Sequence, residues 1–93
     1  MNVMSKEEII DRVKHICQAH NVSHLRLFGS YAKETNLPTS DIDFVVFGCD
    51  EIEELRSDID DIPTLRQIDV FDYDSVTNPY LREDMDKYGI QIF

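Results

Sequence analysis

The stretch from residue 28 to residue 48 reads FGSYAKETNLPTSDIDFVVFG, and its spacing is the most informative feature of the sequence. The pair Gly29-Ser30 is separated by ten residues from Asp41-Ile42-Asp43. From residue 41 to residue 47 the even positions are all apolar, and the odd positions change from aspartate to valine and phenylalanine. This pattern predicts a strand whose second half is covered on both faces, as in the centre of a sheet.

The two aspartates of this strand have a spacing that suits metal binding. On a strand, residues i and i+2 point to the same face about 7 Å apart. Because neighbouring carboxylates repel each other, Asp41 and Asp43 need a cation between them if both are to stay ionised. Mg²⁺ prefers oxygen ligands and completes its octahedron with water and substrate phosphates. The pattern therefore predicts a Mg²⁺ site at Asp41 and Asp43, and a solvated strand end is the alternative.

A near copy of this motif provides an internal comparison. Residues 57–60 repeat the Ser-Asp-Ile-Asp of residues 40–43, but the apolar residues around the copy follow helical spacing. Residues two apart on a helix diverge by about 200°. We therefore expect Asp58 and Asp60 to lie on a solvated helix face, with Ile59 turned inward and no metal pair.

The Gly29-Ser30 pair is a candidate phosphate-binding turn. A glycine at a strand end, followed by a helical turn over residues 30–34 and a loop over 35–40, lets backbone N–H groups approach a phosphate. The Ser30 hydroxyl adds a donor, although Ser30 could also serve only as a helix cap.

A third carboxylate, Asp69, falls in a further expected strand over residues 65–73. If that strand neighbours strand 41–47, Asp69 faces the first two aspartates across the ladder. It can then bind a second metal or accept a proton from an attacking hydroxyl. The alternative is a surface residue of an acidic strand.

The rest of the chain alternates between helices and strands. Ser5 and Glu8 form a capping box, Asp50 is placed to cap a helix, and Asn78-Pro79 begins another. The expected elements are helix 6–20, strand 22–28, strand 41–47, a helix between 50 and 63, strand 65–73, a helix from 78 to 89 and strand 90–93. The expected inward-facing residues of the last two helices are Ile52, Leu55, Ile59, Ile62, Leu81, Met85 and Tyr88. This order predicts one domain over residues 1–93, an α/β (α+β) sandwich with helices packed on a mixed sheet of three or four strands.

The charge and the cysteines narrow the class of protein. Nineteen acidic residues against nine Lys and Arg give a formal net charge of −10, which argues against nucleic acid as a bulk partner and against an anionic membrane. No apolar run approaches the ~20 residues of a membrane span, and the N-terminus lacks the pattern of a signal peptide. Cys17 and Cys49 form no CxxC pair, and Cys17 lies on an apolar helical stripe. We therefore expect a cytoplasmic protein.

The stretch 28–48 resembles the GS-x10-D-x-D signature of the nucleotidyltransferase superfamily that includes DNA polymerase β, and the short chain resembles its minimal nucleotidyltransferase (MNT) family. The resemblance implies the nucleotidyltransferase fold and ATP as substrate. It implies that Gly29 and Ser30 hold the nucleotide phosphates, that Asp41 and Asp43 bind Mg²⁺, and that Asp69 completes a catalytic triad around two metal ions. Family members often carry Arg where this chain has Tyr31, which leaves Lys33 as the loop cation able to bind phosphate.

The resemblance also implies a partner. Small family members are commonly encoded beside a HEPN-domain protein, and several act as antitoxins that transfer AMP from ATP to a tyrosine of that toxin. We expect the same here, with a homo- or hetero-oligomer supplying surface that so short a chain lacks. Two alternatives stay open: an antitoxin that binds nucleotide and blocks its partner sterically, and a transferase acting on a small molecule such as an antibiotic. The acidic run 50–61 is expected to be a solvated face, or a surface for a basic partner.

Overall fold

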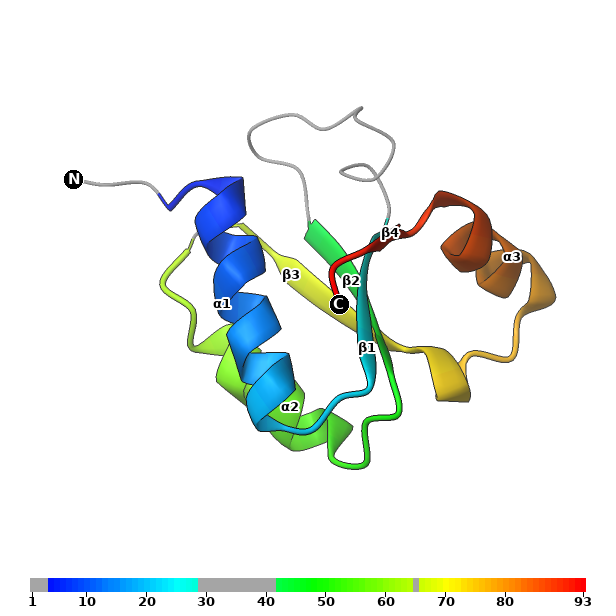
Figure 1. The fold of residues 1–93 in the computed structure, drawn as a ribbon, viewed down its shortest axis with the longest axis horizontal. Coiled ribbons are helices and arrows are strands. Elements are labelled where there is room, and N and C mark those ends of the chain that lie inside the picture. Colours follow the sequence, from blue (N-terminus) through cyan, green and yellow to red (C-terminus); the bar gives the residue numbers. More distant parts are fainter. Residues whose placement is uncertain (1–3, 29–41, 65) are drawn as a thin grey trace.

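The computed structural model describes residues 4–28, 42–64 and 66–93. The segment 29–41 lies outside the described residues. It contains four residues that are predicted above to bind phosphate or metal, Gly29, Ser30, Lys33 and Asp41. It also contains Tyr31, where family members often carry Arg. The elements are α1 (Lys6–Ala19), β1 (His24–Phe28), β2 (Ile42–Phe47), α2 (Ile52–Asp60), β3 (Ile68–Asp72), η1 (Tyr73–Ser75), α3 (Pro79–Tyr88) and β4 (Ile90–Gln91) (Figure 1).

The four strands form one mixed sheet in the order β3-β2-β1-β4. The strand β1 pairs antiparallel with both β2 and β4, whereas β2 and β3 run parallel. The chain between β2 and β3 is therefore a crossover that carries α2. The position of β2 inside the sheet and the complete burial of Val45 confirm that this strand is central and covered on both faces.

One face of the sheet packs against α1 and α2 and forms the main core. The helices contribute Ile9, Val13 and Cys17 from α1 and Leu55 and Ile59 from α2. The strands contribute their alternate apolar residues, which are Leu25, Leu27, Ile42, Phe44, Val46 and Val70. Figure 1 shows α1 and α2 together beside the sheet and α3 apart from them. The expected α/β sandwich on a mixed sheet is confirmed.

Local capping signals fix both ends of α1 and the start of α3. The Ser5 hydroxyl accepts a hydrogen bond from the Glu8 amide (3.2 Å), and Asn78 caps α3 by accepting from the amides of Tyr80 and Leu81. Asn21, with φ of 60°, takes the left-handed conformation just after α1. These signals lie within one or two turns of the helix, which is why the sequence alone predicts them.

Two expectations about helices are wrong. Asp50 does not cap α2, because the helix begins only at Ile52 and its N-cap is Glu51, whose side chain makes no capping hydrogen bond. Tyr88 does not face inward: 38% of it is exposed, whereas Met85 on the same helix is fully buried. The helix α3 ends at Tyr88, and it is Met85, one turn earlier, that turns toward the sheet.

The third strand is shorter than expected. It ends at Asp72 rather than at Tyr73, because the Asp72 carboxylate accepts hydrogen bonds from the Asp74 amide (3.2 Å) and the Ser75 hydroxyl (2.9 Å). These bonds turn the chain into η1. In the described part of the chain, no helix is long and apolar enough to cross a membrane.

Candidate active site

The face of the sheet opposite α1 and α2 carries a regular grid of side chains, because register partners in a sheet point to the same face. Asp43 of β2 is the register partner of Asp69 on β3 and of Phe28 on β1. These three residues form a row at the level where β2 and β3 begin and β1 ends. The expected neighbourhood of Asp43 and Asp69 is therefore present, and both side chains are half-buried.

The Asp69 carboxylate has a defined partner. Gln67 Nε2 donates a hydrogen bond to Asp69 Oδ1 (3.1 Å), and the two residues lie two apart on the same face of the chain. This bond restricts the rotation of the carboxylate. Gln67 was missed by the sequence analysis, although its position two residues before a candidate catalytic aspartate could have identified it.

An aromatic pair borders the row of carboxylates. The rings of Phe28 and Phe71 meet edge to face, with centroids 6.1 Å apart and an angle of 89° between their planes. Phe71 is the register partner of the buried Val45. The carboxylates of Asp43 and Asp69 thus lie beside an apolar floor, where charges interact more strongly than in open water.

The helix α3 packs on the same face, farther along the strands. Arg82 stacks on the Tyr73 ring at 4.6 Å and donates to the Tyr73 carbonyl (3.1 Å). Tyr73 in turn packs on Phe47, with centroids 4.4 Å apart. Arg26 approaches the same Phe47 ring at 5.4 Å and donates to the carbonyl of Met85. Cation–π and polar contacts therefore hold α3 on the sheet together with the buried Met85.

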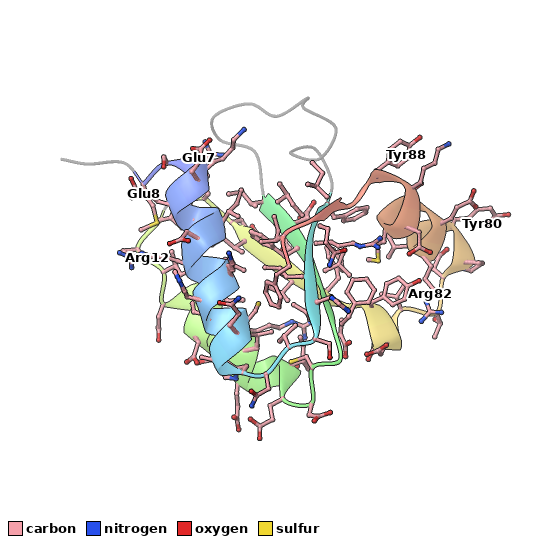
Figure 2. The ribbon with its side chains drawn as sticks, in the orientation of Figure 1. Glu7, Glu8, Arg12, Tyr80, Arg82 and Tyr88 are labelled. Carbon is pink, nitrogen blue, oxygen red and sulfur yellow. The ribbon has the colours of Figure 1, made fainter. Side chains whose placement is uncertain are left out.

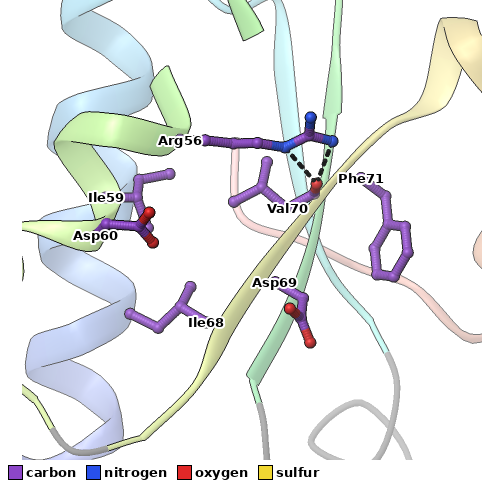
Figure 3. A pocket seen from close by; sticks show the side chains of 7 residues that line it. All are labelled: Arg56, Ile59, Asp60, Ile68, Asp69, Val70 and Phe71. Carbon is purple, nitrogen blue, oxygen red and sulfur yellow. Dashed lines mark hydrogen bonds between the residues drawn. The ribbon is translucent and has the colours of Figure 1, made fainter. Parts of the chain in front are cut away.

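A groove runs along the outer edge of β3, and we call it the edge groove. One part of this groove, the first cavity, has a volume of about 370 Å³ and is lined by residues of α2 and β3: Arg56, Ile59, Asp60, Ile68, Asp69, Val70 and Phe71. A second cavity of about 310 Å³ shares Ile59, Asp60, Ile68 and Asp69 with the first. Figure 3 shows Asp60 on α2 and Asp69 on β3, with the Asp69 side chain pointing away from α2 on the far side of the strand.

The chemistry of Asp43 and Asp69 suits a hard divalent cation. Aligned carboxylates at one level of a sheet repel each other unless a cation lies between them, and their oxygens are the ligands that Mg²⁺ prefers. Within the residues that the structure describes, no group of three His, Cys, Asp or Glu side chains could hold a metal ion. Asp41, the third expected member, lies outside the described residues.

The near copy of the motif behaves as expected. Ile59 is 1% exposed, and the two aspartates beside it leave α2 in different directions. Asp58 contacts His20 Nε2 of α1 (2.6 Å), whereas Asp60 lines the edge groove. On a helix, the sequence Ser-Asp-Ile-Asp therefore does not bring two carboxylates together.

Cys17 shows no sign of catalytic activation. Cys17 is fully buried in the main core, and this burial, with a smaller contribution from Cys49, raises the pKa of its thiol to about 12. A thiol that stays protonated at neutral pH is a poor nucleophile. Cys17 is a core residue, as its position on the helical stripe indicates.

The fold and the paired carboxylates on its open face define the class of nucleotidyltransferases. Residues 11–93 match the family described as polymerase beta, nucleotidyltransferase. The chain therefore belongs to the polymerase β-like nucleotidyltransferase family, and the resemblance of the stretch 28–48 is confirmed.

Two relatives from Methanocaldococcus jannaschii align over almost the whole chain. The protein named "Putative protein adenylyltransferase MJ0126" is 27% identical over 92 residues, which cover 94% of this chain and 93% of the relative. The protein named "Putative protein adenylyltransferase MJ1217" is 29% identical over 92 residues, covering 92% of this chain and 93% of the relative.

Two solved structures share the fold. One is a crystal structure of a toxin–antitoxin with AMP-PNP, with a TM-score of 0.68 and 23% identity, covering 90% of this chain and 72% of that one. The other is the toxin–antitoxin MntA–HpeT with two aspartates, two positions apart, replaced by glutamate. Its TM-score is 0.65 and its identity 20%, covering 90% of this chain and 71% of that one.

Proposed function

We propose that this chain is a Mg²⁺-dependent enzyme that transfers AMP from ATP to a protein hydroxyl, a tyrosine of a HEPN-domain toxin, and so acts as an antitoxin. The observation that carries the proposal is the register alignment of Asp43 with Asp69 in a nucleotidyltransferase fold. The names of the two archaeal relatives support protein as the acceptor. The toxin–antitoxin structures of the same fold, one with AMP-PNP, support the antitoxin role and the adenine nucleotide.

On the nucleotide side, the sequence assigns Gly29, Ser30 and Lys33 to the phosphates of ATP, and Asp41 with Asp43 to the metal. Mg²⁺, when bound, neutralises the triphosphate and stabilises the negative charge that develops during transfer. This neutralisation matters in a chain of net charge −10, which repels a bare triphosphate. The replaced aspartates of the MntA–HpeT variant have the spacing of Asp41 and Asp43.

On the acceptor side, Asp69 acts as the general base. Its carboxylate accepts the proton of the acceptor hydroxyl while the hydroxyl oxygen forms a bond to the α-phosphorus of ATP. The bond between that phosphorus and the bridging oxygen to the β-phosphate breaks, and pyrophosphate leaves with the electron pair. Gln67 holds Asp69 through its 3.1 Å hydrogen bond, so the carboxylate meets the hydroxyl in one orientation.

The test measures both the transfer of AMP to the partner and the neutralisation of the partner's toxicity. The chain is incubated with α-labelled ATP, Mg²⁺ and the protein encoded beside it, which the proposal expects to be a HEPN-domain toxin. In parallel the two proteins are co-expressed and growth is measured. The proposal predicts label on a tyrosine of the partner and growth rescue, both lost in Asp43→Asn. Rescue by Asp43→Asn without label would instead support steric blocking, and label on an aminoglycoside but not on protein would support the small-molecule transferase.

A further inference from the structure

The strand β3 is an edge strand, and its outward backbone groups can be assigned from the ladder. The Ile42 amide donates to the Gln67 carbonyl (2.9 Å), so the odd-numbered residues of β3 direct their backbone groups to β2. Because successive residues of a strand alternate, the backbone groups of Ile68 and Val70 point to the free edge. Arg56 confirms this direction, since its guanidinium donates twice to the Val70 carbonyl, at 2.9 and 3.2 Å (Figure 3).

The edge groove therefore offers a backbone template beside the candidate general base. The Ile68 carbonyl and the Val70 amide flank Asp69 in sequence, and they face the groove whose wall Asp69 forms. An extended peptide that pairs with an edge strand gains main-chain hydrogen bonds, while pockets select its alternate side chains. A segment paired at this level of β3 would pass within reach of the Asp69 carboxylate.

The charges of the groove favour one kind of segment. Asp60 and Asp69 line it, and the helix α2 that forms its outer wall belongs to the acidic run 50–61. Two cations line the groove: Arg56 in the first cavity, which donates to the Val70 carbonyl and to Glu53 Oε1 (3.2 Å), and Arg66 in the second cavity. Ile59 and Ile68 supply an apolar base between the acids. The acidic run of α2 around Asp60 therefore favours an extended segment whose residues flanking the hydroxyl are basic.

We propose that the edge groove binds the acceptor protein as an added β-strand with basic flanks, which brings its hydroxyl to Asp69. This inference rests on the proposed function and adds to it the conformation and charge of the acceptor. Asp60 is then a specificity-determining residue that attracts the flanking cations without touching the reacting atoms.

The experiment uses two labelled peptides in the absence of nucleotide: one alternates lysine and threonine around a central tyrosine, and the other has glutamate in place of each lysine. Fluorescence anisotropy measures their binding to the wild type, to Asp60→Arg, and to Glu54→Arg. Glu54 lies on the same helix outside the edge groove, so this control makes the same charge change. Both positions are exposed, so both variants are expected to fold.

The groove proposal predicts that the wild type binds the basic peptide more tightly and that Asp60→Arg weakens this binding about five- to tenfold. Glu54→Arg keeps the wild-type preference. Hydrogen exchange with the basic peptide bound should slow at the amides of Ile68 and Val70. Equal affinity for the two peptides, identical behaviour of the two variants, or protection elsewhere would overturn the proposal. Protection at Ile68 and Val70 that rises with protein concentration without peptide would assign the edge to a second copy of this chain.

These measurements distinguish failure of the transferase proposal from failure of the edge-groove proposal. If the peptides bind as predicted but wild type with ATP and Mg²⁺ labels no tyrosine, the groove is a peptide site and the transferase proposal fails. If tyrosine is labelled and Asp60→Arg leaves the KM ratio of the two peptides unchanged, transfer stands and the groove proposal fails.

Discussion

Asp43 of β2 and Asp69 of β3 are register partners in a parallel ladder, so their carboxylates project from one level of one face of the sheet. The two residues are far apart in the sequence. Their alignment results from the crossover through α2, which returns the chain to run beside β2 in the same direction. The proposed chemistry depends on this alignment.

Replacing Asp69 by asparagine should remove the general base while leaving the fold intact. We expect the rate of AMP transfer to fall by about 10²- to 10⁴-fold, with the melting temperature unchanged or slightly raised because one of two repelling charges is lost. Rate measurements under saturating ATP and thermal melts check both effects. Asp58→Asn is the matched control from the near copy of the motif, and it should keep transfer within about twofold. A loss of transfer in the control as large as in Asp69→Asn would contradict the assignment.

Replacing Asp43 by asparagine should abolish the stabilisation of the fold by bound nucleotide and Mg²⁺. In the wild type, AMP-PNP with Mg²⁺ at about 100 times its Kd should stabilise the fold by ~2.7 kcal/mol and raise the melting temperature by about 10–20 °C. In Asp43→Asn this ligand-induced shift should largely vanish. Differential scanning fluorimetry with AMP-PNP, with and without Mg²⁺, measures it. A full shift in the variant, or a full shift with AMP-PNP alone, would exclude the metal role of Asp43.

Replacing Gln67 by leucine should lower kcat more than it changes KM. The hydrogen bond to Asp69 orients the carboxylate and binds no substrate, so its loss should reduce kcat by about tenfold with the acceptor KM nearly constant. Steady-state kinetics with varied acceptor separate the two constants. A rise in KM with constant kcat would show that Gln67 binds the acceptor instead.

Replacing Arg82 by methionine should loosen α3. The stack on Tyr73 and the bond to the Tyr73 carbonyl together should contribute about 1–2 kcal/mol. Urea unfolding and hydrogen exchange of α3 amides measure the loss. Lys87→Met is the control, because Lys87 lies 5.3 Å from the ring of Tyr88, which is exposed, and it should cost under about 0.5 kcal/mol. Equal losses in the two variants would exclude Arg82 as the anchor. Figure 2 shows Arg82 on the side of α3 nearer the sheet and Tyr80, 77% exposed, at its periphery.

The two cysteines should differ in reactivity. Cys17 is fully buried and its pKa is raised to about 12, so iodoacetamide at pH 8 should leave it unmodified in the folded protein. Cys49, which is half-buried, should be alkylated first. Peptide mass mapping with and without urea distinguishes them. Rapid alkylation of Cys17 in the native protein would show that the α1 core opens readily.

The fold could be predicted because its signals are local or periodic. The continuous apolar run in the second half of β2 identified this strand as central, and the caps Ser5 and Asn78 fixed helix starts. Helical spacing separated the copy at Asp58 and Asp60 from the true strand motif. The cap at Asp50 could not be predicted correctly, since a shift of one residue in the start of α2 makes Glu51 the N-cap. Such shifts depend on packing, which the sequence does not display.

The site could be predicted only as far as its signature residues. The alignment of Asp43 with Asp69 followed from the condition that two strands are neighbours, and the ladder meets that condition. The edge groove was not foreseen, because it needs both the exposed edge of β3 and the position of Arg56 on α2. The anchoring of α3 by Arg82 depends on the turn at η1. Contacts between distant segments of this kind have no periodic pattern in the sequence.

We propose above that this fold transfers AMP to a protein hydroxyl through the aligned carboxylates of Asp43 and Asp69. The most direct measurement is the intact mass of the proposed HEPN-domain partner after incubation with the chain, ATP and Mg²⁺, followed by mapping of the modified residue. We predict a mass increase of one or more adenylyl groups on a tyrosine, absent with Asp43→Asn or Asp69→Asn. An unmodified partner with the wild type would exclude AMP transfer to the proposed partner, and equal modification with both variants would exclude a role of these carboxylates in transfer.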